Sequence, residues 1–295
     1  MVMTPMLFAL LIVLAEAAFA AGGATGKSSL GRLDLFSFAF LRALGGVAGI
    51  LLVSTLTGKA DEMLGLDGSR LPLVALSAAL FATGNALYVA ALKVGDLSVV
   101  TPLVRSSPLF VLVLALLFLR ERITLPFLLS TPLILSGVVL ISGARPRIRE
   151  TQRPSDNRGV FLALGISILD AGWLVASKAT LRWVSPYALA LIQLSAYLLI
   201  SFALALLLKR LKAISVRQAA LACASGFLSW GIGDVIYLIA LREVPAILAA
   251  LLSGTGILFS VVFGGLFFRE RLAGRHLVGA CLIVLGATLA TIRGA

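Results

Sequence analysis

Apolar residues occur along this chain in long blocks that short polar connectors separate. A block of about 20 residues, wound at 1.5 Å per residue, matches the ~30 Å hydrocarbon core of a bilayer. The short alternating segments of a transmembrane β-barrel are not seen. The pattern predicts an all-α polytopic membrane protein with ten transmembrane helices, at residues 4–24, 35–57, 72–92, 97–119, 124–144, 159–181, 186–208, 217–241, 245–268 and 273–293.

The second half of the chain repeats the first. Residues 81–122 align with 230–271 without gaps at an offset of 149, and 13 of the 42 positions are identical. Because each copy holds five helices, an odd number, the second copy enters the membrane in the opposite direction. We expect two inverted five-helix repeats, 1–144 and 159–295, joined by a linker at 145–158. The matched polar positions are Glu16 with Asp170, Asn85 with Asp234, Tyr88 with Tyr237, and Arg120-Glu121-Arg122 with Arg269-Glu270-Arg271.

Composition agrees with a membrane protein and excludes other classes. Sixty per cent of the 295 residues are hydrophobic and 13% are charged, against about 25% charged in soluble domains. The net charge of +12 comes from Lys and Arg that lie mostly in connectors, where they meet lipid head groups, so no nucleic-acid partner is expected. Cys223 and Cys281 fall in apolar blocks without disulfide or metal-ligand spacing. No catalytic triad and no intact phosphate-binding loop is present, so we expect no cofactor, no metal and no enzyme.

Ionisable residues inside the apolar blocks are the candidate site. Each costs at least about 2.5–3.5 kcal/mol at the bilayer centre, so each needs a reason. Glu16 and Asp170 lie midway along their blocks at matched repeat positions, where they could exchange a proton for substrate. Alternatively, a neighbouring cation neutralises each of them. Asn85 and Asp234 form a second matched pair, which could bind substrate or form interhelical hydrogen bonds.

Aromatic residues near these positions extend the candidate site. Tyr88 and Tyr237 follow the second pair by one turn. Trp173 lies in the same block as Asp170, and Trp230 lies in the same block as Asp234. All four could line a cavity, or they could anchor helices at the membrane interface, which is a common role of Tyr and Trp. The two tryptophans could also simply pack between helices.

Three cations also lie within apolar blocks: Arg42, Arg105 and Lys178. Arg105 stands between Pro102 and Pro108, which must loosen the helix and favour a substrate-binding or gating element. The repeat counterpart carries Gly254 and Gly256 instead, which loosen the backbone by another route. Arg42 could bind substrate or neutralise Glu16 or Asp170, and Lys178 lies near enough to a helix end to reach the interface.

Two stretches carry a family resemblance: ALYVAALKVGDLSVVTPLVRSSPLFVLVLALLFLRERIT and VIYLIALREVPAILAALLSGTGILFSVVFGGLFFRERLA. They resemble EamA-type members of the drug/metabolite transporter superfamily. The resemblance implies a secondary active transporter in the plasma or inner membrane that moves a small polar or amphipathic metabolite, amino acid or drug-like, by alternating access. It leaves a lipid-linked or nucleotide/phosphate-sugar carrier open as the alternative. The expected partners are the small-molecule substrate and membrane lipid, with the chain a monomer or weak dimer.

The orientation in the membrane stays open at this stage. Connectors on one side carry 15 Lys and Arg, and those on the side of the termini carry 7. By the positive-inside rule, the termini would lie outside the cell. The family resemblance implies cytoplasmic termini instead.

Overall fold

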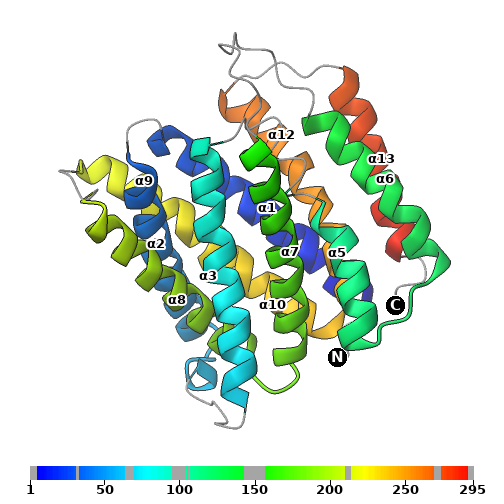
Figure 1. Cartoon of the computed structure of the whole chain (residues 1–295), viewed down its shortest axis with the longest axis horizontal. Coiled ribbons are helices and arrows are strands. Elements are labelled where there is room, and N and C mark those ends of the chain that lie inside the picture. The colour runs from blue at the N-terminus through cyan, green and yellow to red at the C-terminus, as the bar shows by residue number, and fades with distance from the viewer. Residues whose placement is uncertain are drawn as a thin grey trace.

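The computed structural model describes residues 5–30, 33–63, 70–94, 104, 106–142, 157–209, 214–268 and 274–291, and these residues contain helices and turns but no strand. The long helices lie side by side in a bundle (Figure 1). The elements are α1 (Pro5–Leu30), α2 (Leu35–Leu56), η1 (Asp61–Met63), α3 (Leu71–Val94), α5 (Ser107–Leu114), η3 (Ala115–Leu119), α6 (Leu125–Ser142), α7 (Asn157–Thr180), α8 (Pro186–Leu207), α9 (Val216–Gly226), η4 (Phe227–Gly233), α10 (Asp234–Glu243), α11 (Ala246–Leu252), η5 (Ser253–Thr255), α12 (Gly256–Phe268) and α13 (Gly274–Thr291).

The predicted apolar blocks fold as helices. In the described part of the chain, eight helices are long and apolar enough to cross a membrane. Two further apolar helices, Ser107–Leu119 and Leu125–Ile141, are shorter. The structure thus confirms an all-helical polytopic protein, and it supports eight of the ten expected crossings by length.

Turn chemistry fixes where the helices begin. Ser185 caps α8 by accepting a hydrogen bond from the Ala188 N–H, and Pro186 occupies the first turn of that helix. Proline is tolerated at this position because its missing N–H would have no partner in the helix. Ser215 caps α9 and Asp34 caps α2 in the same way.

Glycines let two helix pairs approach closely. A Cβ at Gly49 of α2 would lie 2.7 Å from the Gly231 Cα in η4, and a Cβ at Gly137 of α6 would lie 2.6 Å from the Gly279 carbonyl oxygen of α13. Helices in membranes associate through such small residues, since lipid provides no hydrophobic drive for their packing.

Three segments depart from regular α-geometry. The π-helical segment η3 follows α5, and a second π-helical segment, η4, joins α9 to α10. The 3-10 turn η5 joins α11 to α12. Such segments are rare and occur frequently at functional sites. Two of the three lie beside the polar residues described below.

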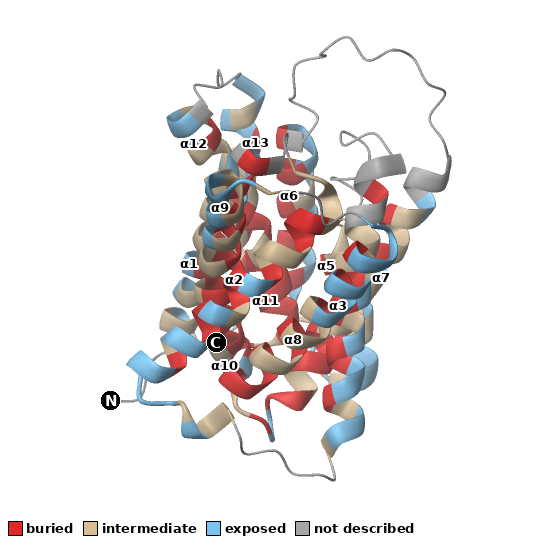
Figure 2. Ribbon diagram, turned by 90° about the vertical axis from the view of Figure 1, so that its left-hand side faces the viewer, coloured by how far each residue is buried: buried red, intermediate tan, exposed pale blue. Residues whose placement is uncertain are grey.

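The bundle is apolar toward its surroundings and polar in part of its centre. Large apolar side chains such as Phe118, Leu199 and Leu207 are 73%, 68% and 77% exposed, while Glu16 and Asp234 are buried. A soluble protein would bury the first group and expose the second. Figure 2 shows the buried residues filling the middle and lower part of the bundle, around α8, α10 and α11.

Candidate functional site

Three carboxylates approach one tyrosine in the centre of the bundle. Glu16 of α1 is 5% exposed and Asp234 of α10 is 1% exposed, while Asp170 of α7 is half-buried. The hydroxyl of Tyr237 interacts electrostatically with all three. The structure thus brings together both members of the Glu16–Asp170 pair and the acidic member of the second pair.

Two glycines leave room for these carboxylates. A Cβ at Gly256 would collide with the Glu16 Oε2 atom, and a Cβ at Gly84 would lie 3.3 Å from the Asp170 Oδ1 atom. Gly256 follows the 3-10 turn η5, which carries the loosened backbone expected there. The local break in the helix therefore brings backbone, rather than a side chain, against the Glu16 carboxylate.

Asp234 carries an unsatisfied acceptor. Its Oδ2 atom is buried and has no hydrogen-bond partner among the described residues. The residue stands where η4 ends, and its N–H donates to the Ser229 carbonyl five residues earlier. A buried polar atom without a partner costs about 1–3 kcal/mol, and more for a charged group. A ligand that donates a hydrogen bond or carries positive charge would remove this cost.

Aromatic rings form a panel beside the carboxylates. Trp173 stacks on Tyr237 at 6.1 Å between ring centroids and 20° between planes. Phe81 of α3 lies 5.7 Å from Trp173 and 6.4 Å from Trp230, and Tyr197 of α8 contacts Trp230 edge-on at 5.2 Å. The predicted residues Trp173, Trp230 and Tyr237 thus pack inside the bundle and do not form an interfacial belt.

Arg42 contacts the panel at Trp230. Its guanidinium carbon is 4.1 Å from the centroid of the Trp230 ring, and its Nη2 atom donates to the Ser229 hydroxyl at 2.9 Å. These contacts give no support to the alternative that Arg42 only neutralises Glu16 or Asp170. The Arg42 Nε atom is buried with no hydrogen-bond partner in the described part of the chain. An anionic group of a ligand could accept from it.

A glutamine network holds the panel in place. Gln193 of α8 is fully buried. Its Oε1 atom accepts from Trp173 Nε1 at 3.1 Å, and its Nε2 atom donates to Ser177 at 2.9 Å and to Ser77 at 3.3 Å. Three helices, α3, α7 and α8, are therefore joined beside Trp173, and the indole orientation is fixed.

The remaining predicted residues lie elsewhere or outside the described part. Asn85 donates to the Phe81 carbonyl of its own helix at 2.9 Å, and Tyr88 packs against a small cluster formed by Ala91, Ala163 and Ile166. Arg105 and Pro102 lie outside the described residues. Pro108 occupies the first turn of α5, and Gly254 packs against Ile134 of α6.

Several site residues escaped the sequence interpretation. Phe81, Tyr197 and Phe19, whose ring lies 6.2 Å from the Tyr237 ring, are aromatic residues in apolar blocks. The sequence does not indicate which face of such a helix points inward. Gln193 carried a usable signal, because it is an uncharged polar residue within the otherwise apolar block 186–208. Side chains of this kind usually form hydrogen bonds between membrane helices.

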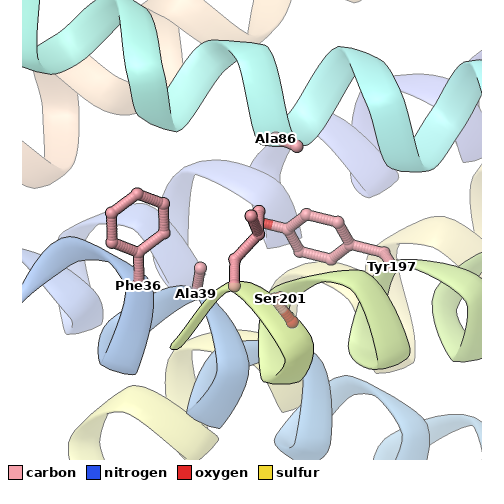
Figure 3. Close-up of a pocket in the computed structure, with 6 residues that line it drawn as sticks. Phe36, Ala39, Ala86, Tyr197 and Ser201 are labelled. Atoms are coloured by element: carbon pink, nitrogen blue, oxygen red, sulfur yellow. The ribbon is translucent and has the colours of Figure 1, made fainter. Parts of the chain in front are cut away.

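A pocket adjoins the panel between α2, α3 and α8. It is lined by Phe36, Ala39, Ala86, Tyr197, Ser201 and Leu204. Figure 3 shows the Tyr197 hydroxyl pointing into it between Ala39 and Ala86. Since Tyr197 also contacts Trp230, one aromatic ring separates this mostly apolar pocket from the ring that carries Arg42.

Comparisons with known proteins agree with the repeat and the fold. The model of the EamA-like transporter family matches twice, at residues 6–143 and 157–292. An uncharacterized protein of Methanocaldococcus jannaschii is 33% identical over 96 residues, which are 32% of this chain and 70% of that protein. A protein of known crystal structure superposes with a TM-score of 0.83 at 19% identity and covers 98% of this chain and 97% of its own. The last likeness shows the fold alone.

Proposed function

The chain belongs to the EamA-like transporter family, and we propose that it is a secondary active transporter that moves a small polar or amphipathic metabolite, amino acid or drug-like, by alternating access. The family is one of transporters and not of enzymes, and the chain is a multi-pass membrane protein. Family membership does not specify the substrate class or the mechanism, and these are what we propose.

The observation that carries the proposal is a pair of buried polar atoms near the aromatic panel. Among the described residues, the Asp234 Oδ2 atom has no hydrogen-bond donor and the Arg42 Nε atom has no acceptor. Both are buried in a bundle whose outer surface is apolar. A ligand with an amine at one end, an acid or carbonyl group at the other and an apolar body between them would satisfy both atoms and stack on the rings.

The duplication supports alternating access. The halves 1–144 and 159–295 would rock against each other around the central residues, as inverted repeats do in other secondary transporters. The M. jannaschii relative adds support, because 96 residues at 70% of its length give a protein of about 137 residues. That length is close to one repeat of this chain.

Proton exchange at Glu16 and Asp170 is the proposed driving force. A carboxylate inside a membrane protein can be neutralised by a proton or by a cationic substrate, and competition between the two couples their movements. Glu16 is the better placed of the two, since it is almost fully buried and lies against the Gly256 backbone.

A carrier of sugar phosphates or lipid-linked phosphates is the alternative within the same fold. Asp234 is an anionic group whose Oδ2 atom has no hydrogen-bond partner among the described residues. It would attract an amine and repel a phosphate, so it favours a substrate with an amine.

Transport in proteoliposomes tests the proposal. A thermal-shift screen against amino acids, polyamines, sugar phosphates and nucleotide sugars first identifies the class that binds. We expect amine-bearing compounds to stabilise the wild type, and Asp234→Asn to remove that shift. Glu16→Gln should fold normally but lose proton-driven uptake. Uptake by Glu16→Gln at the wild-type rate would rule out the role of Glu16.

A further inference from the structure

The turn between α10 and α11 is held from two sides by opposite charges. On one side, the carboxylate of Glu121, just past η3, accepts hydrogen bonds from the first two amides of α11. The Oε1 atom is 2.7 Å from Ala246 N, and the Oε2 atom is 3.2 Å from Ile247 N. These N–H groups have no partner within their own helix, so the carboxylate supplies one.

On the other side, Lys178 of α7 binds the end of α10. Its Nζ atom donates to the carbonyl oxygens of Leu241 and Arg242, both at 2.9 Å. A cation is favourable at a helix C-terminus and an anion at an N-terminus, because each opposes the partial charge of the exposed backbone groups. Lys178 and Glu121 also attract each other electrostatically. The two side chains therefore clamp one turn to α7 and to the end of η3.

The clamped turn closes one face of the bundle. Every residue of α11 is buried, and Figure 1 shows the turn between α10 and α11 at the lower end of the bundle. Ser253, at the other end of α11, bonds to the Tyr237 hydroxyl at 3.2 Å and to the Ala249 carbonyl of its own helix. Ala249 precedes Ser253 by one turn on the same helix face. The buried helix α11 thus connects the clamped turn to Ser253, which contacts the same tyrosine as the three carboxylates.

We propose that Glu121 and Lys178 are gate residues, which lock this face closed and must release the turn before the central site can open to it. The inference rests on the proposed transport function. Opening requires the turn between α10 and α11 to move away from α7 and from the end of η3, and this movement breaks all four hydrogen bonds.

The two repeats are unequal in this respect. The sequence counterpart of Glu121 is Glu270, but the counterpart of Lys178 at the offset of 154 is Ala24. The basic residue in the last turn of α1 is Lys27 instead, so the cation stands at a different position in the two copies.

Cysteine accessibility tests the gate without any knowledge of the substrate. The reporter Ala249→Cys, which is fully buried in the closed state, is placed in a Cys223→Ala, Cys281→Ser background. Its labelling by a membrane-impermeant maleimide is followed in nanodiscs. We expect slow labelling in the otherwise wild-type chain. Glu121→Gln or Lys178→Met should each raise the rate about tenfold, since each removes charge-assisted hydrogen bonds.

The matched control uses a charge of the same turn whose side chain lies outside the clamp. The Arg242 side chain is half-exposed at 49% and lies 4.0 Å from Glu243, and Arg242→Met should leave the rate unchanged because Lys178 binds only the Arg242 backbone carbonyl. Glu121→Asp replaces Glu121→Gln if the latter is not monodisperse, and each variant is tested separately. Fast labelling of the wild type, or equal rates in gate and control variants, would overturn the gate. Since labelling needs no cargo, this failure is distinct from absent transport in proteoliposomes, which would instead refute the proposed function.

Discussion

Substitution of Gln193 by leucine isolates the network that positions Trp173. The variant removes three hydrogen bonds that join α3, α7 and α8. Hydrogen bonds between membrane helices contribute about 0.6 kcal/mol each on average, so the free energy of unfolding should fall by about 2 kcal/mol. Leucine fills most of the volume, so the loss is one of polar contacts and not of packing. The freed Trp173 indole should also lose its fixed stacking on Tyr237.

The free energy of unfolding is measured by steric trapping or by SDS titration in bicelles, and the indole orientation by tryptophan fluorescence. Ser54→Ala is the matched control: Ser54 is equally buried, but among the described residues its hydroxyl donates to the Leu51 carbonyl within α2 and to no other helix. We expect the control to lose less than about 0.5 kcal/mol. A Gln193→Leu variant as stable as this control would refute the role of the network.

Three further predictions concern Glu16, the orientation and one surface lysine. Gly256→Ala should displace the Glu16 carboxylate and destabilise the chain by about 1–3 kcal/mol, the usual cost of overpacking, as thermal unfolding would show. With cytoplasmic termini, a membrane-impermeant thiol reagent should label Lys27→Cys in intact cells and should not label Lys59→Cys. The reverse labelling pattern would mean that the termini lie outside, as the positive-inside rule indicates. The pKa of Lys59 is raised first by its hydrogen bond to Glu62 and next by the Glu62 charge. Glu62→Gln should therefore lower this pKa and speed acylation of Lys59 at alkaline pH, which mass spectrometry measures.

The Gly256→Ala prediction has a control variant, and the Lys59 prediction has a pH dependence. Gly274→Ala places a methyl group where no atom lies within 4 Å, so it should leave the stability unchanged. The contribution of Lys59 to stability should persist at neutral pH and fade only as the pH rises through its raised pKa. Acylation of Lys59 at the same rate in both chains would contradict the assigned pairing.

The sequence predicts the helices well because the bilayer imposes their length. The blocks 35–57 and 186–208 correspond to Leu35–Leu56 and Pro186–Leu207, within one residue at each end. The carboxylates were also predictable, since an acid such as Glu16 in an apolar block demands an explanation. The break at Ser253–Thr255 follows from its small residues.

The partners of these residues could not be predicted from the sequence. Arg42 contacts Ser229 and Trp230, which are 187 residues or more away along the chain, and no spacing rule joins them. Lys178 illustrates the same limit. Its position near a helix end was evident, but its hydrogen bonds to α10 depend on how two distant helices pack.

Counterflow of radiolabelled phenylalanine into proteoliposomes preloaded with the unlabelled amino acid tests the central claim most directly. Phenylalanine carries the amine, the carboxylate and the apolar ring that Asp234, Arg42 and the aromatic panel would bind. The account predicts counterflow in the wild type without ATP, and its loss in both Asp234→Asn and Arg42→Gln with folding intact. Counterflow at the wild-type rate in both variants would contradict the account, because phenylalanine would then cross without the Asp234 carboxylate and the Arg42 guanidinium in the centre of the bundle.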